Sequence, residues 1–256
     1  ALLSQASNSS EAIDRMWGVK IPMRDGVRLN ATVYKPKGAV ALPVVFTLTP
    51  YISDFYHPRA YYFSQNGYVF AIVDSRGRGN SGGTFTPELQ EANDGHDIVQ
   101  WLAKQPWSNG AVAMWGGSYA GYDQWATAKE FPAGLKTIVP AASAFAGVDF
   151  PFFKNIFYSY EMQWLTLTSG VTGNDYLFGE SSFWIQKFRE LFIRHLPFSK
   201  LDSIIGNSST VFQTVIRHPQ PDAFWDAYNP TNEQFARINM PILTITGHYD
   251  DDQPGA

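Results

Sequence analysis

The hexapeptide Gly116-Gly117-Ser118-Tyr119-Ala120-Gly121 decides the fold class of this chain. It follows the apolar run Ala111–Trp115 and precedes the helix-like stretch Tyr122–Phe131, so the pattern predicts a strand, a tight turn and a helix. A turn of this kind lifts a serine hydroxyl above the edge of a sheet, and the N–H groups that open the helix face any oxyanion formed there. Ser118 is therefore a candidate nucleophile. The alternative is a glycine-rich turn in which the serine only caps the helix.

Length and composition indicate one large globular α/β unit. The chain has 256 residues with 45% hydrophobic and 16% charged residues, a net charge of -4 and no cysteine. The absence of cysteine excludes a disulfide scaffold and a thiolate nucleophile. Because the chain has no Lys/Arg-rich run and no apolar run of about 18 residues, we expect neither a nucleic-acid partner nor a membrane span. A homo-oligomer is compatible with the sequence, which leaves the cellular compartment open.

Short apolar runs alternate with helical patterns along most of the chain. The Asp25-Gly26 pair predicts a hairpin between strands near 21–22 and 29–34, and further strands are expected at 44–48, 68–73, 135–140 and 241–247. A helix is expected from Asn93 to Lys104, capped by Asn93 or Asp94. Strands that alternate with helices predict a mostly parallel sheet with helices on both faces, the α/β-hydrolase arrangement.

The segment 145–235 breaks this alternation. It lacks buried-strand runs and holds 20 of the 40 aromatic residues of the chain. The stretch 182–192 has apolar residues at helical spacing. We therefore expect a core in residues 1–144, an inserted helical cap in 145–235, and a continuation of the core in 236–256. Most cap aromatics would pack against the core, and a few would line an apolar pocket.

The loop Gly77–Gly82 spells G-x-G-x-x-G after a predicted strand, a pattern of dinucleotide sites. The pattern requires a helix directly after the glycines, to hold a pyrophosphate at its N-terminus. Here the helix starts about ten residues later, so the motif indicates a structural loop that Asp74 and Arg76 hold in place.

Five motifs occur in an order and spacing that resemble one family: TPY at 49–51, DSRGRGNSG at 74–82, QPWSNG at 105–110, GGSYAG at 116–121 and GHYD at 247–250. The chain resembles the serine hydrolases related to cocaine esterase, α-amino acid ester hydrolase and X-prolyl dipeptidyl-peptidase. The family motif G-x-S-Y-x-G accounts for Ala120, which departs from the commoner G-x-S-x-G.

The resemblance implies roles for individual residues. Ser118 would be the nucleophile, the Tyr119 N–H and the Tyr51 hydroxyl would donate to the oxyanion, and Asp250 would be the acid of a catalytic triad. Asp251 and Asp252 adjoin Asp250, and this trio also fits a solvated acidic loop or a weak cation site. The resemblance implies neither a metal nor an organic cofactor.

The triad order in this fold is Ser, Asp, His, yet no histidine follows Asp250. Among the five histidines, His57 is the one conceivable substitute, in a loop that follows Tyr51. The family continues with a histidine loop, a last core strand and a β-sandwich of jelly-roll type. We therefore expect this chain to be part of a longer protein, and to be nearly inert without that histidine.

Ester or amide hydrolysis through an acyl-enzyme is the favoured function, with a small-molecule ester, an amide or a short peptide as substrate. An amino- or dipeptidyl-peptidase is the first alternative, because carboxylates in the pocket could bind a free α-amino group. A non-catalytic binding module is the second. Candidate substrate-binding residues are Asp123, Glu161, Asp222, Trp225 and Asp226.

Overall fold

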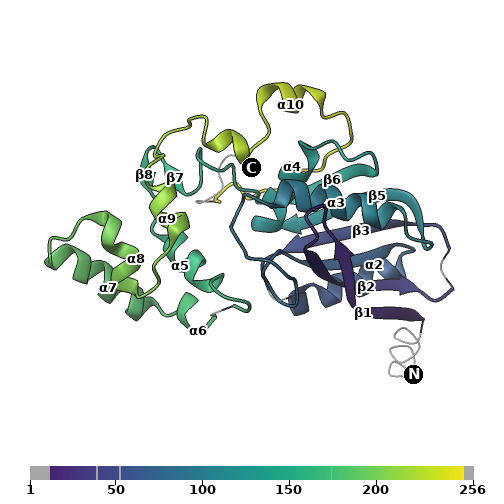
Figure 1. Cartoon of the computed structure of the whole chain (residues 1–256), viewed down its shortest axis with the longest axis horizontal. Helices are drawn as coiled ribbons and strands as arrows, with labels where there is room; N and C mark the ends of the chain where they lie inside the picture. Colours follow the sequence, from purple (N-terminus) through teal and green to yellow (C-terminus); the bar gives the residue numbers. More distant parts are fainter. Residues whose placement is uncertain (1–11, 39, 52, 174, 251–256) are drawn as a thin grey trace.

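A six-stranded sheet organises the chain in the computed structural model, which describes residues 12–38, 40–51, 53–173 and 175–250 (Figure 1). The strand order is β1-β2-β4-β3-β5-β6, in which β4, β3, β5 and β6 are parallel and β1 and β2 are antiparallel. The strands are β1 Ile13–Pro22, β2 Arg28–Pro36, β3 Leu42–Thr49, β4 Val69–Asp74, β5 Ser108–Gly117 and β6 Leu135–Ala141. The prediction of a mostly parallel α/β-hydrolase sheet is confirmed.

Helices cover both faces of this sheet. α3 (Glu91–Ala103) and α4 (Tyr119–Ala128) pack on one face, and α2 (His57–Gln65) packs on the other, where the short turn η1 (Ser53–Tyr56) leads into it. Alternate side chains of β3 enter the two cores, Val44 and Phe46 on the α3 side and Val45 on the α2 side. This alternation is the reason that the central strands are continuous apolar runs.

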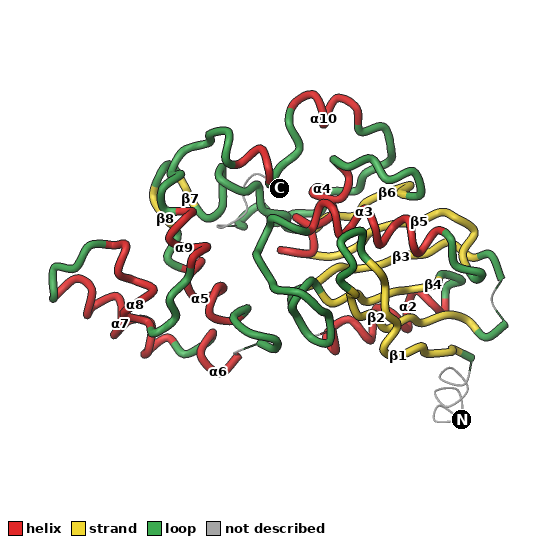
Figure 2. The backbone as a smooth tube through the Cα atoms, in the orientation of Figure 1, coloured by secondary structure: helices red, strands yellow, loops and turns green. Residues whose placement is uncertain are grey.

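The part of the segment 145–235 that precedes residue 232 forms a second lobe beside the sheet, and its helices are grouped together in Figure 2. Its core includes Met162, Trp184 and Phe212 and is continuous with Tyr119 and Tyr122 of α4. Its elements are β7 Phe152–Phe153, β8 Ile156–Phe157, α5 Tyr160–Leu167, α6 Asp175–Phe178, α7 Ser181–Ile193, η2 Phe198–Lys200, α8 Leu201–Ile205, α9 Thr210–Val215 and η3 Trp225–Ala227. The two-residue strands β7 and β8 form a minimal hairpin, and the helix α10 (Asn232–Arg237) follows the lobe.

Two polar contacts hold the ends of this lobe against each other and against α4. The Asn229 amide donates from Nδ2 to the Ala146 carbonyl at 2.7 Å, which joins the end of the segment to its start. The buried Lys129 ammonium, at the end of α4, donates to the backbone carbonyls of residues 226, 227 and 229. These contacts therefore join the start of the segment to its end, and its end to α4.

Several local predictions were wrong. α4 starts at Tyr119, directly after the serine, and α3 starts at Glu91 with Gln90 at the N-cap, so neither Asn93 nor Asp94 caps it. His57 does not lie in a loop, because it opens α2. Pro58 in the first turn is a start signal for α2 that the apolar periodicity does not show.

The strand expected at 241–247 is reduced to two parallel bridges with β6, Ile138 with Ile242 and Ala141 with Ile245. It therefore extends the sheet beyond β6 in the expected order, without a continuous ladder. Leu243 and Ile245 are exposed.

Candidate active site

Ser118 lies at the tip of the turn between β5 and α4, in the conformation of a strained elbow. Its backbone has φ 57° and ψ -124°, which a residue with a side chain rarely adopts. Its N–H donates to the Ala141 carbonyl at 2.9 Å, and its own carbonyl accepts from the N–H groups of Gly121 and Tyr122. The surrounding structure therefore holds the strain, and strain of this kind concentrates at functional sites.

Two glycines of the hexapeptide make this elbow possible by allowing close backbone approach. A Cβ on Gly116 would lie 2.7 Å from the Cβ of Ala120, and a Cβ on Gly121 would lie 2.9 Å from the Ala141 carbonyl oxygen. Ala120 itself is buried in the turn. The strand and helix can therefore cross at Ser118 only with glycine at positions 116 and 121.

Tyr51 lies beside Ser118, because β3 and β5 are neighbouring parallel strands and both residues follow their carboxyl ends. Both side chains line the same cavity, and the Ser118 side chain lies close enough to the Tyr51 hydroxyl to lower its pKa. The Tyr51 oxygen accepts a hydrogen bond from the Trp164 indole N–H at 3.0 Å. Burial raises the pKa of the Tyr51 hydroxyl, while the contacts with Ser118 and Trp164 act in the opposite direction. Tyr51 therefore stays protonated and can donate a hydrogen bond.

A cavity of about 350 Å³ opens between Ser118 and the helical segment. Its wall is mainly aromatic and aliphatic, and Ser118 and Arg78 are among the polar residues that line it. The lining residues are Tyr51, Phe55, Tyr56, Arg78, Ser118, Tyr160, Trp164, Leu167, Gly173 and Phe178. Such a cavity suits an apolar group attached to a carbonyl at Ser118.

The Tyr119 side chain is held by hydrogen bonds at its hydroxyl and by stacking of its ring. Its hydroxyl donates to Glu91 Oε1 at 2.7 Å and accepts from the Glu88 N–H at 2.6 Å. Its ring stacks on the Trp164 indole, with centroids 5.2 Å apart and planes at 18°. The N–H of Tyr119 is one of the first in α4, and such groups have no acceptor within their own helix. That N–H is therefore available beside Ser118.

Carboxyl groups cluster close to the elbow. Glu88 lines a small cavity together with Ser118, Tyr51 and Tyr119. Glu161 is buried, and its Oε2 makes no hydrogen bond with a described residue. Burial raises the pKa of Glu161 to about 8, and burial followed by the charge of Glu161 raises that of Glu88. Glu88 was not among the predicted site residues, because it follows no strand and belongs to no motif.

The other four predicted substrate-binding residues lie outside the cavities at Ser118. Asp123 is fully buried on α4, neither of its carboxylate oxygens bonds a described residue, and burial raises its pKa. Asp222 accepts a hydrogen bond from His218 at 2.8 Å, and Asp226 is exposed. The Trp225 indole packs in the core of the helical segment and donates to the His218 carbonyl. None of these four residues lines the cavities at Ser118.

Asp250 lies at the same edge of the sheet as Ser118. The Ala142 N–H donates to the Ile245 carbonyl at 2.7 Å, so the segment that leads to Asp250 runs beside the end of β6. β6 in turn neighbours β5, which ends at Ser118. Asp250 closes a turn in which its N–H donates to the Gly247 carbonyl. Asp251 and Asp252 lie outside the described residues.

None of the five histidines lines the cavities at Ser118. Both ring nitrogens of His57 are engaged, one with the Tyr34 hydroxyl at 2.6 Å and the other with Asp54 at 3.0 Å. His57 is therefore unsuited to act as the base, although it follows Tyr51 closely in sequence.

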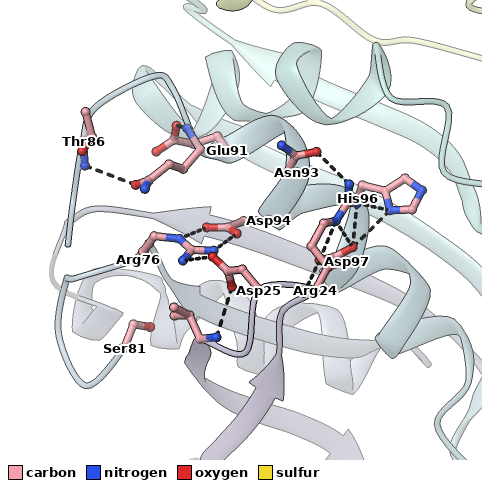
Figure 3. Close-up of polar contacts among 12 residues, drawn as sticks. Arg24, Asp25, Arg76, Ser81, Thr86, Glu91, Asn93, Asp94, His96 and Asp97 are labelled. Carbon is pink, nitrogen blue, oxygen red and sulfur yellow. Dashed lines mark hydrogen bonds and ion pairs between the residues drawn. The ribbon is translucent and has the colours of Figure 1, made fainter. Parts of the chain in front are cut away.

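The glycine-rich loop 77–82 is a structural element, as predicted. Asp74 Oδ2 accepts from the Asn30 side-chain amide and from the Asn80 N–H. Arg76 donates to Asp94 and, at 2.6 Å, to Asp25 (Figure 3). These bonds fasten the loop to α3 and to the β1–β2 turn. Arg78 and Gly79, further along the loop, contact the helical segment.

Comparison with known proteins agrees with this geometry. The family model for X-Pro dipeptidyl-peptidase (S15 family) matches residues 25–255. The chain belongs to the S15 family. This S15 chain is 36% identical to the cocaine esterase of Rhodococcus sp. (strain MB1 Bresler) over 134 aligned residues. The alignment covers 49% of the chain and 23% of the length of that relative. The predicted family resemblance is confirmed.

Solved structures support the same fold for this S15 chain. An aminopeptidase from the marine sediment archaeon Thaumarchaeota archaeon has a TM-score of 0.77 and 25% identity over 94% of the chain. An α-amino acid ester hydrolase has a TM-score of 0.72 and 23% identity over 92% of it, a likeness of fold. The chain spans 44% and 42% of these two structures. None of the described helices combines the length and apolar character needed to cross a membrane.

Proposed function

We propose that this chain carries the nucleophile of a serine hydrolase that cleaves carboxylic ester or amide bonds. The observation that carries the proposal is the strained Ser118 elbow, which lines the same cavity as the Tyr51 hydroxyl. In the reaction, Ser118 Oγ loses its proton to a base and forms a bond to the substrate carbonyl carbon. The alcohol or amine then leaves with a proton, and water releases the acid from the acyl-enzyme.

Two donors flank the position where the oxyanion would form. The Tyr51 hydroxyl lies in the cavity wall beside Ser118 and is held by the Trp164 indole N–H, and the Tyr119 N–H opens α4 directly after the serine. Donors that are fixed in advance stabilise developing charge without reorganisation during the reaction. Tyr51 and Tyr119 are therefore the proposed oxyanion hole.

Asp250 is the proposed triad acid, because the segment that carries it adjoins the end of β6 at the edge where Ser118 lies. It would orient a histidine that takes the Ser118 proton. The cavities at Ser118 contain none of the five histidines, so we assign the base to a histidine outside this set.

The segment 145–235 is the proposed cap, inserted between β6 and the strand-like residues 242–245. It supplies Tyr160, Trp164, Leu167 and Phe178 to the apolar cavity. An apolar acyl group or side chain would lie there, with its carbonyl at Ser118.

A peptidase or amino-ester hydrolase is the second candidate. Glu88 lines the cavity at Ser118, and Glu161 lies close enough to raise its pKa. An ammonium group that binds beside these carboxyl groups would lower their raised pKa values, so that a carboxylate could form an ion pair with it. This arrangement favours substrates with a free α-amino group, and one of the similar structures is described as an aminopeptidase.

Burst kinetics of the full-length protein with a 4-nitrophenyl ester test the proposal. We expect a burst of nitrophenol equal to the enzyme concentration and a loss of at least about 10⁴-fold in kcat for Ser118→Ala. Ser143→Ala is the control, because Ser143 is also buried near the elbow but bonds the Ala144 carbonyl. Equal activity of Ser118→Ala and the wild type would refute the proposal, and a folded protein without activity would favour a binding module.

The same assay separates the two substrate classes. An amino acid ester and its N-acetyl derivative form a matched pair that differs in the ammonium group. Faster cleavage of the free amino ester supports the peptidase-like candidate, and faster cleavage of the acetylated ester argues against it.

A further inference from the structure

Trp164, on helix α5 of the cap, contacts both proposed oxyanion donors. Its indole N–H donates to the Tyr51 oxygen at 3.0 Å, and its ring stacks on the ring of Tyr119. The side chain is 94% buried, since 6% of its surface is exposed. Trp164 therefore does more than form a wall of the cavity, because its one polar atom is used on Tyr51.

The hydrogen bond from Trp164 determines in which direction the Tyr51 hydroxyl can donate its proton. A phenol has one O–H donor and accepts through its oxygen lone pairs. Because the indole N–H occupies a lone pair on one side, the O–H of Tyr51 is left for Ser118 and for an oxyanion. A donor that is itself hydrogen-bonded in this way is polarised and donates more strongly.

Arg78 connects this arrangement to the core. Its side chain is 1% exposed and lies on the loop after β4. Nε donates to the Pro50 carbonyl at 2.8 Å, directly before Tyr51, and Nη1 donates to the Thr168 carbonyl at 2.7 Å and to that of Gly170. Thr168 and Gly170 follow the end of α5, where a cation is favoured by the free carbonyls. One guanidinium thus holds both the chain before Tyr51 and the helix that carries Trp164.

A further backbone contact strengthens the same junction. The Gly79 N–H donates to the Val171 carbonyl at 2.7 Å. Asp74 and Arg76 fasten this loop to the sheet and to α3. The loop therefore fixes the position of the end of α5 relative to the core. The glycine-rich loop thereby acquires a role that its G-x-G-x-x-G pattern does not suggest.

We propose that Trp164 is a positioning residue for the Tyr51 hydroxyl and that Arg78 fixes the position of Trp164 relative to Tyr51. The packing of the cap on the core thereby completes the oxyanion hole. The inference rests on the proposed function of Tyr51 as an oxyanion donor. The competing role for Trp164 is simple packing against the substrate in the cavity.

A double-mutant cycle on kcat and KM separates these two roles. Trp164→Phe keeps an aromatic ring but removes the N–H, and we expect kcat to fall by about 3- to 10-fold with KM unchanged. In a Tyr51→Phe background the same substitution should change kcat less than twofold, because its target is gone. Trp184→Phe is the matched control, since its indole N–H donates to the Leu177 carbonyl and neither Trp184 nor Leu177 lines the cavities at Ser118. Equal losses in both backgrounds, or a rise in KM alone, would overturn the inference.

The indole ¹H–¹⁵N resonance of Trp164 tests the contact without catalysis. We expect Tyr51→Phe and Arg78→Lys to shift this resonance and accelerate its exchange with water, while that of Trp184 stays in place. Arg78→Lys cannot reproduce the forked contact, so its kcat should also fall. An unmoved Trp164 resonance in Tyr51→Phe overturns the inference. An inactive wild type with these shifts present overturns the proposed function and leaves the positioning contact established.

Discussion

Replacing Tyr51 by Phe removes one proposed oxyanion donor and little else. The ring can keep its place in the cavity wall beside Ser118, and the lost oxygen accepts the hydrogen bond of the Trp164 indole. Loss of one such donor typically lowers kcat by about 100- to 1000-fold, or roughly 3–4 kcal/mol in the transition state. The buried Trp164 N–H also loses its acceptor, which costs about 1–3 kcal/mol of folding free energy. KM should change little, because the neutral ester carbonyl gains less from the donor than the oxyanion does.

Steady-state kinetics with a 4-nitrophenyl ester and urea unfolding measure these two effects separately. Tyr56→Phe is the control, because Tyr56 lines the same cavity and its hydroxyl contacts Thr49 at 3.5 Å. We expect its kcat to stay within about threefold of the wild type. The reasoning fails if Tyr51→Phe keeps kcat within threefold, or if Tyr56→Phe loses as much activity as Tyr51→Phe.

Three further substitutions test the elbow and the buried acids. Gly116→Ala places a Cβ 2.7 Å from that of Ala120, so we expect a destabilisation of about 1–3 kcal/mol in urea unfolding and a kcat more than tenfold lower; unchanged kinetics would argue against the elbow geometry. Burial raises the pKa of Glu161 to about 8, so the folded state retains a proton that the unfolded state loses above pH 4.5, and stability falls as pH rises through this window. Glu161→Gln should therefore be more stable than the wild type by about 3 kcal/mol at pH 7 and equal to it near pH 4, whereas a difference independent of pH would contradict this cause. Glu88→Gln should lower kcat/KM at least tenfold for amino acid esters and less than threefold for their N-acetyl derivatives, and equal losses on both would rule out ammonium binding by Glu88.

The sequence was most informative where backbone geometry restricts the residue type. Glycine at 116 and 121 is required by approaches that leave no room for a Cβ, and so the elbow could be predicted from the hexapeptide. The central strands are buried on both faces, and they are therefore visible as apolar runs such as Val44–Leu48. The family resemblance assigned Tyr51 to the oxyanion site, and the structure shows that the strands before Tyr51 and Ser118 are neighbours.

Contacts between distant segments could not be predicted in this way. The Trp164–Tyr51 bond joins residues 113 positions apart, and no local pattern selects Trp164 among the many aromatic residues of the cap. Glu88 lies in a loop and lines the cavity, and its own backbone has φ 67°, a conformation that the sequence does not indicate. The acids chosen from the sequence instead include Asp222, which pairs with a histidine on the surface. Side-chain direction and long-range packing, rather than residue type, decide which acids reach the site.

Covalent labelling of the full-length protein by a fluorophosphonate is the most direct test that Ser118 is the nucleophile. Mass spectrometry of the digested protein would locate the adduct, and a thermal melt would show that each variant is folded. We expect one adduct, on the peptide that contains Ser118, absent from Ser118→Ala and retained in Ser143→Ala. A folded protein that takes no label, or a label on another residue, would contradict the assignment of Ser118.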